Sequence, residues 1–116
     1  MTEHREDLQA IHEEPVREVL AAQAEPRELR NLADTFKILA NPTRLRIVDA
    51  LARQELCVGD LAAVVDASPS AVSHHLRQLR QTDIVRFRRE GRMAYYRLDD
   101  EHVASLFAIG LAHVRE

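Results

Sequence analysis

The stretch SPSAVSHHLRQLRQ, residues 68–81, decides the fold of this 116-residue chain. Ser68 followed by Pro69 is a typical helix start, with serine as the N-cap and proline in the first helical position. At 100° per residue, one face of this helix carries Val72, Leu76 and Leu79, so we expect that face to be buried. The opposite face carries only polar side chains that can reach base edges or phosphates, and we predict that it binds DNA through Ser70, Ser73, His74, Arg77 and Gln81.

The segments on either side support this interpretation. Residues 58–66 predict a shorter helix, and the two helices together have the spacing of a helix-turn-helix. After residue 83 the sequence alternates, and Gly91 supplies a turn, which predicts a β-hairpin over residues 84–98. Arginines cluster on this hairpin, so we interpret it as a wing that contacts the DNA backbone or minor groove through Arg88, Arg89 and Arg92. The alternative is that the polar helix face is an ordinary solvated surface and that some arginines only keep the hairpin in solution.

The remaining segments predict helices. Residues 28–40 have apolar side chains at helical spacing, and Asn41-Pro42 starts a helix over 42–53 that should bury Leu45, Val48 and Leu51. The acidic segment 1–26 predicts short helices at 3–13 and 16–25 and a partly flexible arm, followed by one domain over 27–116. Asp99 is expected to cap a last helix that ends near residue 115. The predicted fold is mainly α with a small β-hairpin wing, a dimeric winged helix-turn-helix of order α-α-α-α-α-β-β-α.

Charge and composition narrow the function. Residues 68–98 carry seven arginines and two acidic residues in a chain of net charge −3, which favours a phosphate-binding surface. No apolar run has the length of a membrane span, the N-terminus lacks a signal sequence, and the single Cys57 cannot form an internal disulfide, so we expect a cytoplasmic protein without membrane contact. With only three glycines, no phosphate-cradling loop and no nucleophile–base pair, we do not expect an enzyme.

The last helix carries metal-type side chains at both ends: Asp100 and His102 at its start, His113 and Glu116 at its end. His102 and His113 share a face but lie about 16 Å apart along a helix, too far for one ion. Because zinc holds nitrogen and oxygen ligands at about 2 Å, one ion would need two antiparallel copies of the helix, hence a symmetric dimer with two equivalent sites. Singly, each residue also has a structural explanation, such as helix-dipole stabilisation by Asp100.

Four segments together resemble the ArsR/SmtB winged-helix metal-sensing repressors, nearest the cyanobacterial zinc-sensor branch: ILANPTRLRIVDALAR (38–53), ELCVGDL (55–61), SPSAVSHHLRQL (68–79) and GRMAYYRL (91–98). The resemblance implies a homodimer that binds an inverted repeat in double-stranded operator DNA and releases it when metal binds, derepressing metal efflux or sequestration genes. It also implies an intersubunit metal site made of Asp100, His102, His113 and Glu116. That ligand set suits Zn²⁺, with Co²⁺, Cd²⁺ or Cu²⁺ possible.

A second site and other functions remain open at this point. Some family members carry a thiol-rich site; Cys57 and Asp60 match it, but the chain has no N-terminal cysteine, so only His4 or His12 could complete a weaker site. A metal-independent or thiol-responsive regulator that uses Cys57 is the alternative function. A third possibility is a small metal-dependent hydrolase or a zinc-buffering protein.

Overall fold

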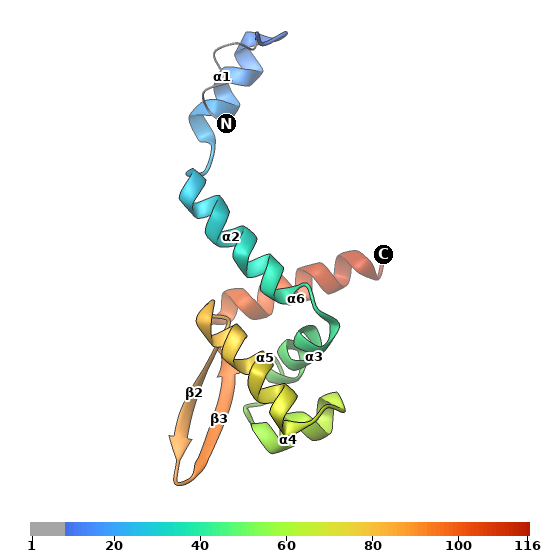
Figure 1. The fold of residues 1–116 in the computed structure, drawn as a ribbon. Helices are drawn as coiled ribbons and strands as arrows, with labels where there is room; N and C mark the ends of the chain where they lie inside the picture. Colours follow the sequence, from blue (N-terminus) through green and yellow to red (C-terminus); the bar gives the residue numbers. More distant parts are fainter. Residues whose placement is uncertain (1–8) are drawn as a thin grey trace. The chain divides into compact units, whose positions relative to one another are not determined.

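The computed structural model describes residues 9–116. The chain divides into two compact units, Met1–Asn31 and Leu32–Glu116. The elements in chain order (Figure 1) are α1 Glu13–Ala22, α2 Pro26–Leu39, α3 Pro42–Leu51, β1 Leu56–Cys57, α4 Val58–Val65, α5 Pro69–Gln81, β2 Val85–Glu90, β3 Met93–Leu98 and α6 Glu101–Val114. The predicted winged helix-turn-helix is confirmed, whereas the boundary placed between residues 26 and 27 stays a prediction.

The N-terminal helices differ from the expectation. The predicted helix over 3–13 is wrong for residues 9–12, which are not helical, and its earlier part lies outside the described residues. α1 starts at Glu13, so the helix expected over 16–25 is shifted towards the N-terminus. Pro15 lies in the first turn of α1, where its missing N–H breaks no helical hydrogen bond. The sequence pattern predicts a boundary between two helices at Pro15, whereas in the structure Pro15 is part of the start of α1.

α3 begins as the sequence indicates. The Asn41 side chain accepts a hydrogen bond from the backbone N–H of Arg44 at 3.0 Å, and Pro42 occupies the first turn. The helix buries Ile47, Val48, Ala50 and Leu51. The expectation that Leu45 is buried is wrong, because its side chain is 38% exposed in the single chain and lines an open apolar groove with residues of α2 and α6.

α4 and α5 form the helix-turn-helix. α4 ends at Asp66, which adopts a left-handed conformation with φ of 55°, and Ser68 then caps α5 by accepting from the N–H of Ala71 at 3.1 Å. The apolar face of α5 is fully buried, with Val72, Leu76 and Leu79 at 0% exposure. These side chains join Ile47, Leu61 and Ile84 in one core, so the helix is held with its polar face outward.

The wing is a hairpin in a three-stranded antiparallel sheet. Glu90 pairs with Met93, which leaves a two-residue turn in which Gly91 adopts a positive φ of 62°. The sheet order is β1-β3-β2, and β1 was not predicted because two residues are too short to show alternation. β1 pairs with Tyr95 and Tyr96, in the middle of β3, and so attaches the hairpin to the segment before α4.

The last helix starts one residue later than expected. Asp99 does not cap it, because its N–H donates to the Ile84 carbonyl at 2.9 Å and its side chain pairs with Arg86 at 3.0 Å. Asp100 is the N-cap instead, and α6 then packs against α3 and β3. Along residues 9–116, no helix has both the length and the apolar character needed to cross a membrane.

Candidate functional site

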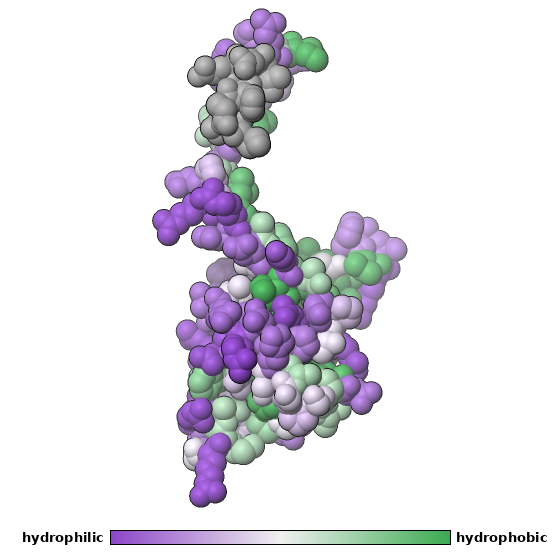
Figure 2. Space-filling model, viewed as in Figure 1, coloured by the Kyte–Doolittle hydropathy of each residue, from purple (hydrophilic) through white to green (hydrophobic). Residues whose placement is uncertain are grey.

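The polar face of α5 lies open to solvent. Ser70, His74, Arg77 and Gln81 are exposed, and Ser73 is half-buried. In the view of Figure 2, hydrophilic side chains cover the region of α5 and the tip of the hairpin. The five residues expected to read DNA therefore share one accessible face, while their role in binding remains a proposal.

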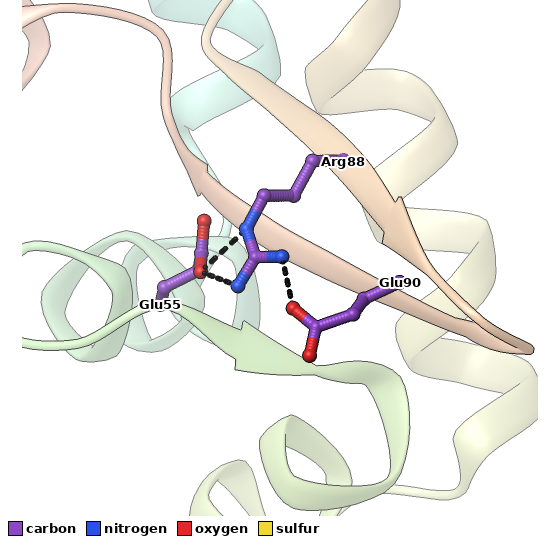
Figure 3. A network of polar contacts seen from close by, with 3 residues as sticks. All are labelled: Glu55, Arg88 and Glu90. Atoms are coloured by element: carbon purple, nitrogen blue, oxygen red, sulfur yellow. Dashed lines mark hydrogen bonds and ion pairs between the residues drawn. The ribbon is translucent and has the colours of Figure 1, made fainter.

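The wing arginines differ in their partners. Arg88 donates from Nε and Nη2 to one oxygen of Glu55, at 3.0 and 2.8 Å, and from Nη1 to Glu90 at 2.6 Å (Figure 3). The hydrogen bonds with Glu55 and Glu90 raise the pKa of Arg88 above its usual range. Arg89 and Arg92 are exposed and have no carboxylate partner among residues 9–116. Of the three wing arginines expected to contact DNA, one is thus already engaged by two acids.

The predicted metal ligands lie in two pairs. At the start of α6, one oxygen of Asp100 accepts from the backbone N–H groups of His102 and Val103 at 2.9 and 3.3 Å, and the other lies 3.4 Å from Nδ1 of His102. The hydrogen bond with His102, helped by the two backbone N–H groups, lowers the pKa of Asp100. One carboxylate oxygen thus caps the helix while the second faces the imidazole.

The second pair lies at the other end of α6. His113 and Glu116 are exposed, and the N–H of Glu116 donates to the His113 carbonyl at 3.3 Å. In the part of a single chain that the structure describes, no three His, Cys, Asp or Glu side chains gather in a geometry that could hold a metal ion. One chain brings together Asp100 with His102, and the other two residues belong to the far end of the same helix.

The comparisons with known proteins agree with this architecture. Residues 41–86 match the description "bacterial regulatory protein, arsR family". The chain is 46% identical to a transcriptional repressor SmtB homologue of Synechocystis, covering 95% of this chain and 83% of the relative, and 38% identical to a cadmium resistance regulatory protein CadC homologue of Staphylococcus aureus, covering 100% and 96%.

A solved structure from Mycobacterium bovis extends the agreement to the fold. It is described as the homodimeric winged helix-turn-helix DNA-binding domain of a possible ArsR-family transcriptional regulator, and it superposes with a TM-score of 0.74 at 36% identity, covering 83% of this chain and 91% of that chain. The chain belongs to the ArsR/SmtB family of metal-sensing repressors. It is therefore a DNA-binding transcriptional regulator and not an enzyme.

In this ArsR/SmtB protein, His75 supports the recognition helix α5. Its Nδ1 accepts a hydrogen bond from Nε of Arg44 at 3.0 Å, and Nη1 of Arg44 donates to the Ile38 carbonyl at 3.3 Å. Burial, followed by the nearby charge of Arg44, lowers the pKa of His75. The side chain thus connects α5 to α3.

Of the residues of the predicted second site, only Cys57 and Asp60 belong to the unit Leu32–Glu116. Cys57 is buried at 6% exposure in β1, whereas Asp60 is exposed in the first turn of α4. His12 is exposed and belongs to the other compact unit, and His4 lies outside the described residues. A site that uses these four residues stays a prediction.

Sequence reasoning did not single out Arg80, a basic residue beside the polar face of α5. Arg80 is exposed in the last turn of α5, and its guanidinium carbon lies 4.5 Å from the centre of the Phe87 ring in β2. On the helical projection, Arg80 falls between the buried and polar faces, so face assignment alone did not select it. Its place in the last turn, next to a basic hairpin, was the available signal.

Proposed function

We propose that this protein is a zinc-responsive repressor. A homodimer without metal binds an inverted-repeat operator in double-stranded DNA, and metal binding across the two α6 helices weakens DNA binding and derepresses genes for metal efflux or sequestration. The assignment of a repressor follows from the family, and the zinc response is the proposal. A regulator of this kind acts on chromosomal DNA, so we place it in the cytoplasm.

One observation carries the proposed metal site: a stripe along α6 made of His102, Leu106, Ile109 and His113. These residues are spaced as i, i+4, i+7 and i+11, which puts them on one face of the helix. Leu106 is 37% exposed and Ile109 is 70% exposed in the single chain. An exposed apolar centre with an imidazole at each end is the pattern of a helix that pairs with another helix.

The spacing of the ligands fits an antiparallel pair. Residue numbers 102 and 113 are centred between 107 and 108, and residue numbers 100 and 116 are centred on 108. A two-fold axis near residue 108 therefore brings His102 opposite His113 of a second copy, and Asp100 opposite Glu116 of that copy. Because a two-fold contact is the same on both sides, the dimer would carry two such sites.

The donor set fits a divalent metal. Two imidazole nitrogens and two carboxylate oxygens can hold Zn²⁺ in a tetrahedral site, and the ion would supply the cross-link between the two helices. The hydrogen bonds of Asp100 already orient its carboxylate next to His102. Co²⁺, Cd²⁺ and Cu²⁺ accept the same ligand types, so the inducing ion also depends on which metal the cell supplies.

An apolar groove beside α6 supports a second copy as the partner. The groove has a volume of about 430 Å³ and lies among α2, α3 and α6, where it is lined by Phe36, Leu39, Leu45, Val48, Val103, Leu106, Phe107, Gly110, Leu111 and Val114. An open apolar surface of this kind is typical of a protein interface. The groove adjoins the stripe on α6, since Leu106 belongs to both.

The DNA face of each subunit would consist of α5 and the wing. We assign major-groove or backbone contacts to Ser70, Ser73, His74, Arg77 and Gln81, and wing contacts to Arg89 and Arg92. In a dimer, the two recognition helices must lie about 34 Å apart to enter successive major grooves on one side of the DNA. Metal binding at α6 would favour a dimer shape in which that distance or orientation no longer fits.

The test is a titration of an operator fragment with and without Zn²⁺ on three proteins: the wild type, His113→Ala and the control His12→Ala. We expect zinc to weaken DNA binding by the wild type and the control, because His12 lies outside α6. His113→Ala should bind DNA normally and lose the zinc response. Retention of the full response by His113→Ala would contradict the α6 site.

The thiol-responsive alternative gives a different result in the same assay. It predicts DNA binding that zinc does not change and that oxidation of Cys57 does. The burial of this thiol in β1 limits its reaction with oxidants, which disfavours the alternative. Binding that is insensitive to zinc in the wild type and abolished by mild oxidation, but not in Cys57→Ser, would establish it.

A further inference from the structure

The basic residues at the wing fall into two sets according to the face of β2. Successive side chains of a strand point to opposite faces, so Arg86 and Arg88 share one face while Phe87 and Arg89 share the other. The two faces differ in their chemistry. One face is rich in carboxylates, and the other is built around an aromatic ring.

On the first face, both arginines are held by acids. Arg86 pairs with Asp99 at 3.0 Å. Arg88 lies over the Tyr95 ring, 4.9 Å from its centre. Its guanidinium also contacts Glu55, the residue before β1, and Glu90 (Figure 3). Arg88 therefore connects β2 with β3 and with the residue that precedes β1. A phosphate at Arg88 would compete with Glu55 and Glu90, and a phosphate at Arg86 would lie near the negative charge of Asp99.

On the second face, two guanidinium groups share one aromatic ring. The guanidinium carbon of Arg80 lies 4.5 Å from the centre of the Phe87 ring, and that of Arg89 lies 5.6 Å from it. Phe87 in turn packs on Tyr96, with 5.3 Å between the ring centres. Of the ion pairs formed within residues 9–116, those at the wing engage Arg86 and Arg88 and none engages Arg80 or Arg89.

The Arg80 and Arg89 guanidinium carbons thus lie 4.5 and 5.6 Å from the same ring centre, and among residues 9–116 no acid pairs with either. Like charges at one ring repel each other, and an anion between them would remove that repulsion. Arg80 belongs to the end of the recognition helix and Arg89 to the wing, so the anion would lie where these two DNA-facing elements meet. Arginine also matches phosphate geometry through paired N–H donors.

We propose that Arg80 and Arg89, held over Phe87, together bind one backbone phosphate of the operator between the recognition helix and the wing. Arg86 and Arg88 are positioning residues that attach the wing to the domain and make no phosphate contact. The inference rests on the DNA binding of the proposed function. The sequence pattern predicts a DNA contact by Arg88 and none by Arg80, and the inference assigns the phosphate contact to Arg80 instead of Arg88.

The salt dependence of DNA binding tests this directly, because each phosphate contact contributes about 0.9 to the slope of log K against log salt. The slope is measured without metal on the operator fragment and on a non-operator duplex. Because a dimer would make one such contact in each subunit, we expect Arg80→Gln and Arg89→Gln each to lower the slope by up to about 1.8 and to weaken binding to both duplexes alike. The matched controls Arg86→Gln and Arg88→Gln should leave the slope unchanged.

Two further variants distinguish the loss of a phosphate contact from a change in the folded structure. Arg80→Lys keeps the charge and should restore the slope, whereas a purely structural role of the guanidinium would not be rescued. Phe87→Leu removes the ring and should weaken binding while the slope stays the same.

An unchanged slope in Arg80→Gln, or a slope reduced in Arg88→Gln, would overturn the inference. Absence of DNA binding by the wild type would overturn the proposed function instead.

Discussion

At the scale of single residues, Asp100 combines two functions in one carboxylate. One oxygen caps α6 through the N–H groups of His102 and Val103, and the other faces the His102 imidazole. Since the cap orients the side chain, the residue that begins the helix also arranges the first half of the proposed metal site. The two functions can be separated, because asparagine is as good an N-cap as aspartate but carries no negative charge.

We therefore predict that Asp100→Asn keeps the thermal stability of the metal-free protein and weakens zinc binding by at least about ten-fold. Even hydrogen-bond partners of metal ligands contribute about ten- to hundred-fold to affinity. Asp100→Ala should lower both quantities, since it removes the cap as well. Thermal unfolding and competition with a zinc-binding dye measure the two effects. Equal zinc affinity in the wild type and Asp100→Asn would exclude this residue as a ligand.

At the scale of elements, α5 is held by apolar burial on one face. Leu76 has 0% exposure at the centre of the core. We predict that Leu76→Ala lowers the free energy of unfolding by roughly 2–5 kcal/mol through the cavity it leaves. Because small domains are stable by only about 5–15 kcal/mol, this change should reduce DNA binding through partial unfolding.

The matched control is Val64→Ala on α4, where the side chain is 54% exposed. It should change stability by no more than about 0.5 kcal/mol. Denaturant unfolding of both variants distinguishes burial from a general loss of apolar surface. A similar effect at the two positions would contradict the core assignment of Leu76.

The link between α5 and α3 depends on pH. Protonation of His75 at Nδ1 would break its hydrogen bond with Arg44 and place two cations together, and burial together with Arg44 lowers the pKa of His75 below its ordinary value of 6.5. The unfolded chain then binds more protons than the folded one. The stabilisation is complete above about pH 6.5 and is lost progressively as the pH falls below that value towards the lowered pKa.

We predict that His75→Asn flattens this dependence. The Oδ1 of asparagine can accept the Arg44 hydrogen bond in place of Nδ1, but the amide does not titrate. The free energy of unfolding, measured at about pH 7.5 and about pH 5.5, should therefore fall less in His75→Asn than in the wild type. A decline of the same size in both proteins would show that His75 does not contribute to the acid sensitivity.

At the scale of the whole molecule, the proposed site needs two copies. The two ends of α6 lie too far apart for one chain to hold an ion with both, and the stripe between them exposes Ile109. We predict that Ile109→Glu dissociates the dimer, because two charges would face each other near the two-fold axis. Analytical ultracentrifugation measures the association state.

Val64→Glu, which changes an exposed valine outside α6, is the control and should remain dimeric. Loss of the dimer should also remove tight zinc binding, because each subunit supplies only half of the ligands. If Ile109→Glu stays dimeric and keeps its zinc response, the interface lies elsewhere.

The DNA and metal sites must affect each other equally in a repressor of this type. If zinc lowers DNA affinity by a certain factor, DNA lowers zinc affinity by the same factor, typically about 5- to 150-fold for a coupling of about 1–3 kcal/mol. Calorimetric titration of zinc into the free dimer and into the DNA complex checks this expectation. Different factors in the two directions would indicate a change in oligomeric state during the experiment.

Local patterns were sufficient to predict the helix-turn-helix, the hairpin and the metal-type residues at the two ends of the last helix. Ser68-Pro69 and Asn41-Pro42 mark helix starts, the spacing of Val72, Leu76 and Leu79 marks a buried face, and Gly91 marks a turn. Each of these signals acts over a few residues, because caps, turns and periodicity depend on hydrogen bonds and side chains that are close in the chain. The sequence thereby determined the helices from α2 to α6, the hairpin and the polar face of α5, but not β1 or the bounds of α1.

Tertiary structure decided which side chains find partners. Glu55 and Arg88 are 33 positions apart in the sequence and form a hydrogen bond, and Arg44 and His75, which are 31 positions apart, form another. No local pattern indicates either contact. The contacts of Asp99 with Ile84 and Arg86 likewise moved the N-cap of α6 to Asp100. The pairing of β1 with β3 added a strand that no local pattern indicates. These features depend on how elements pack in space, since the hydrogen bonds and ion pairs that create them join residues distant in sequence.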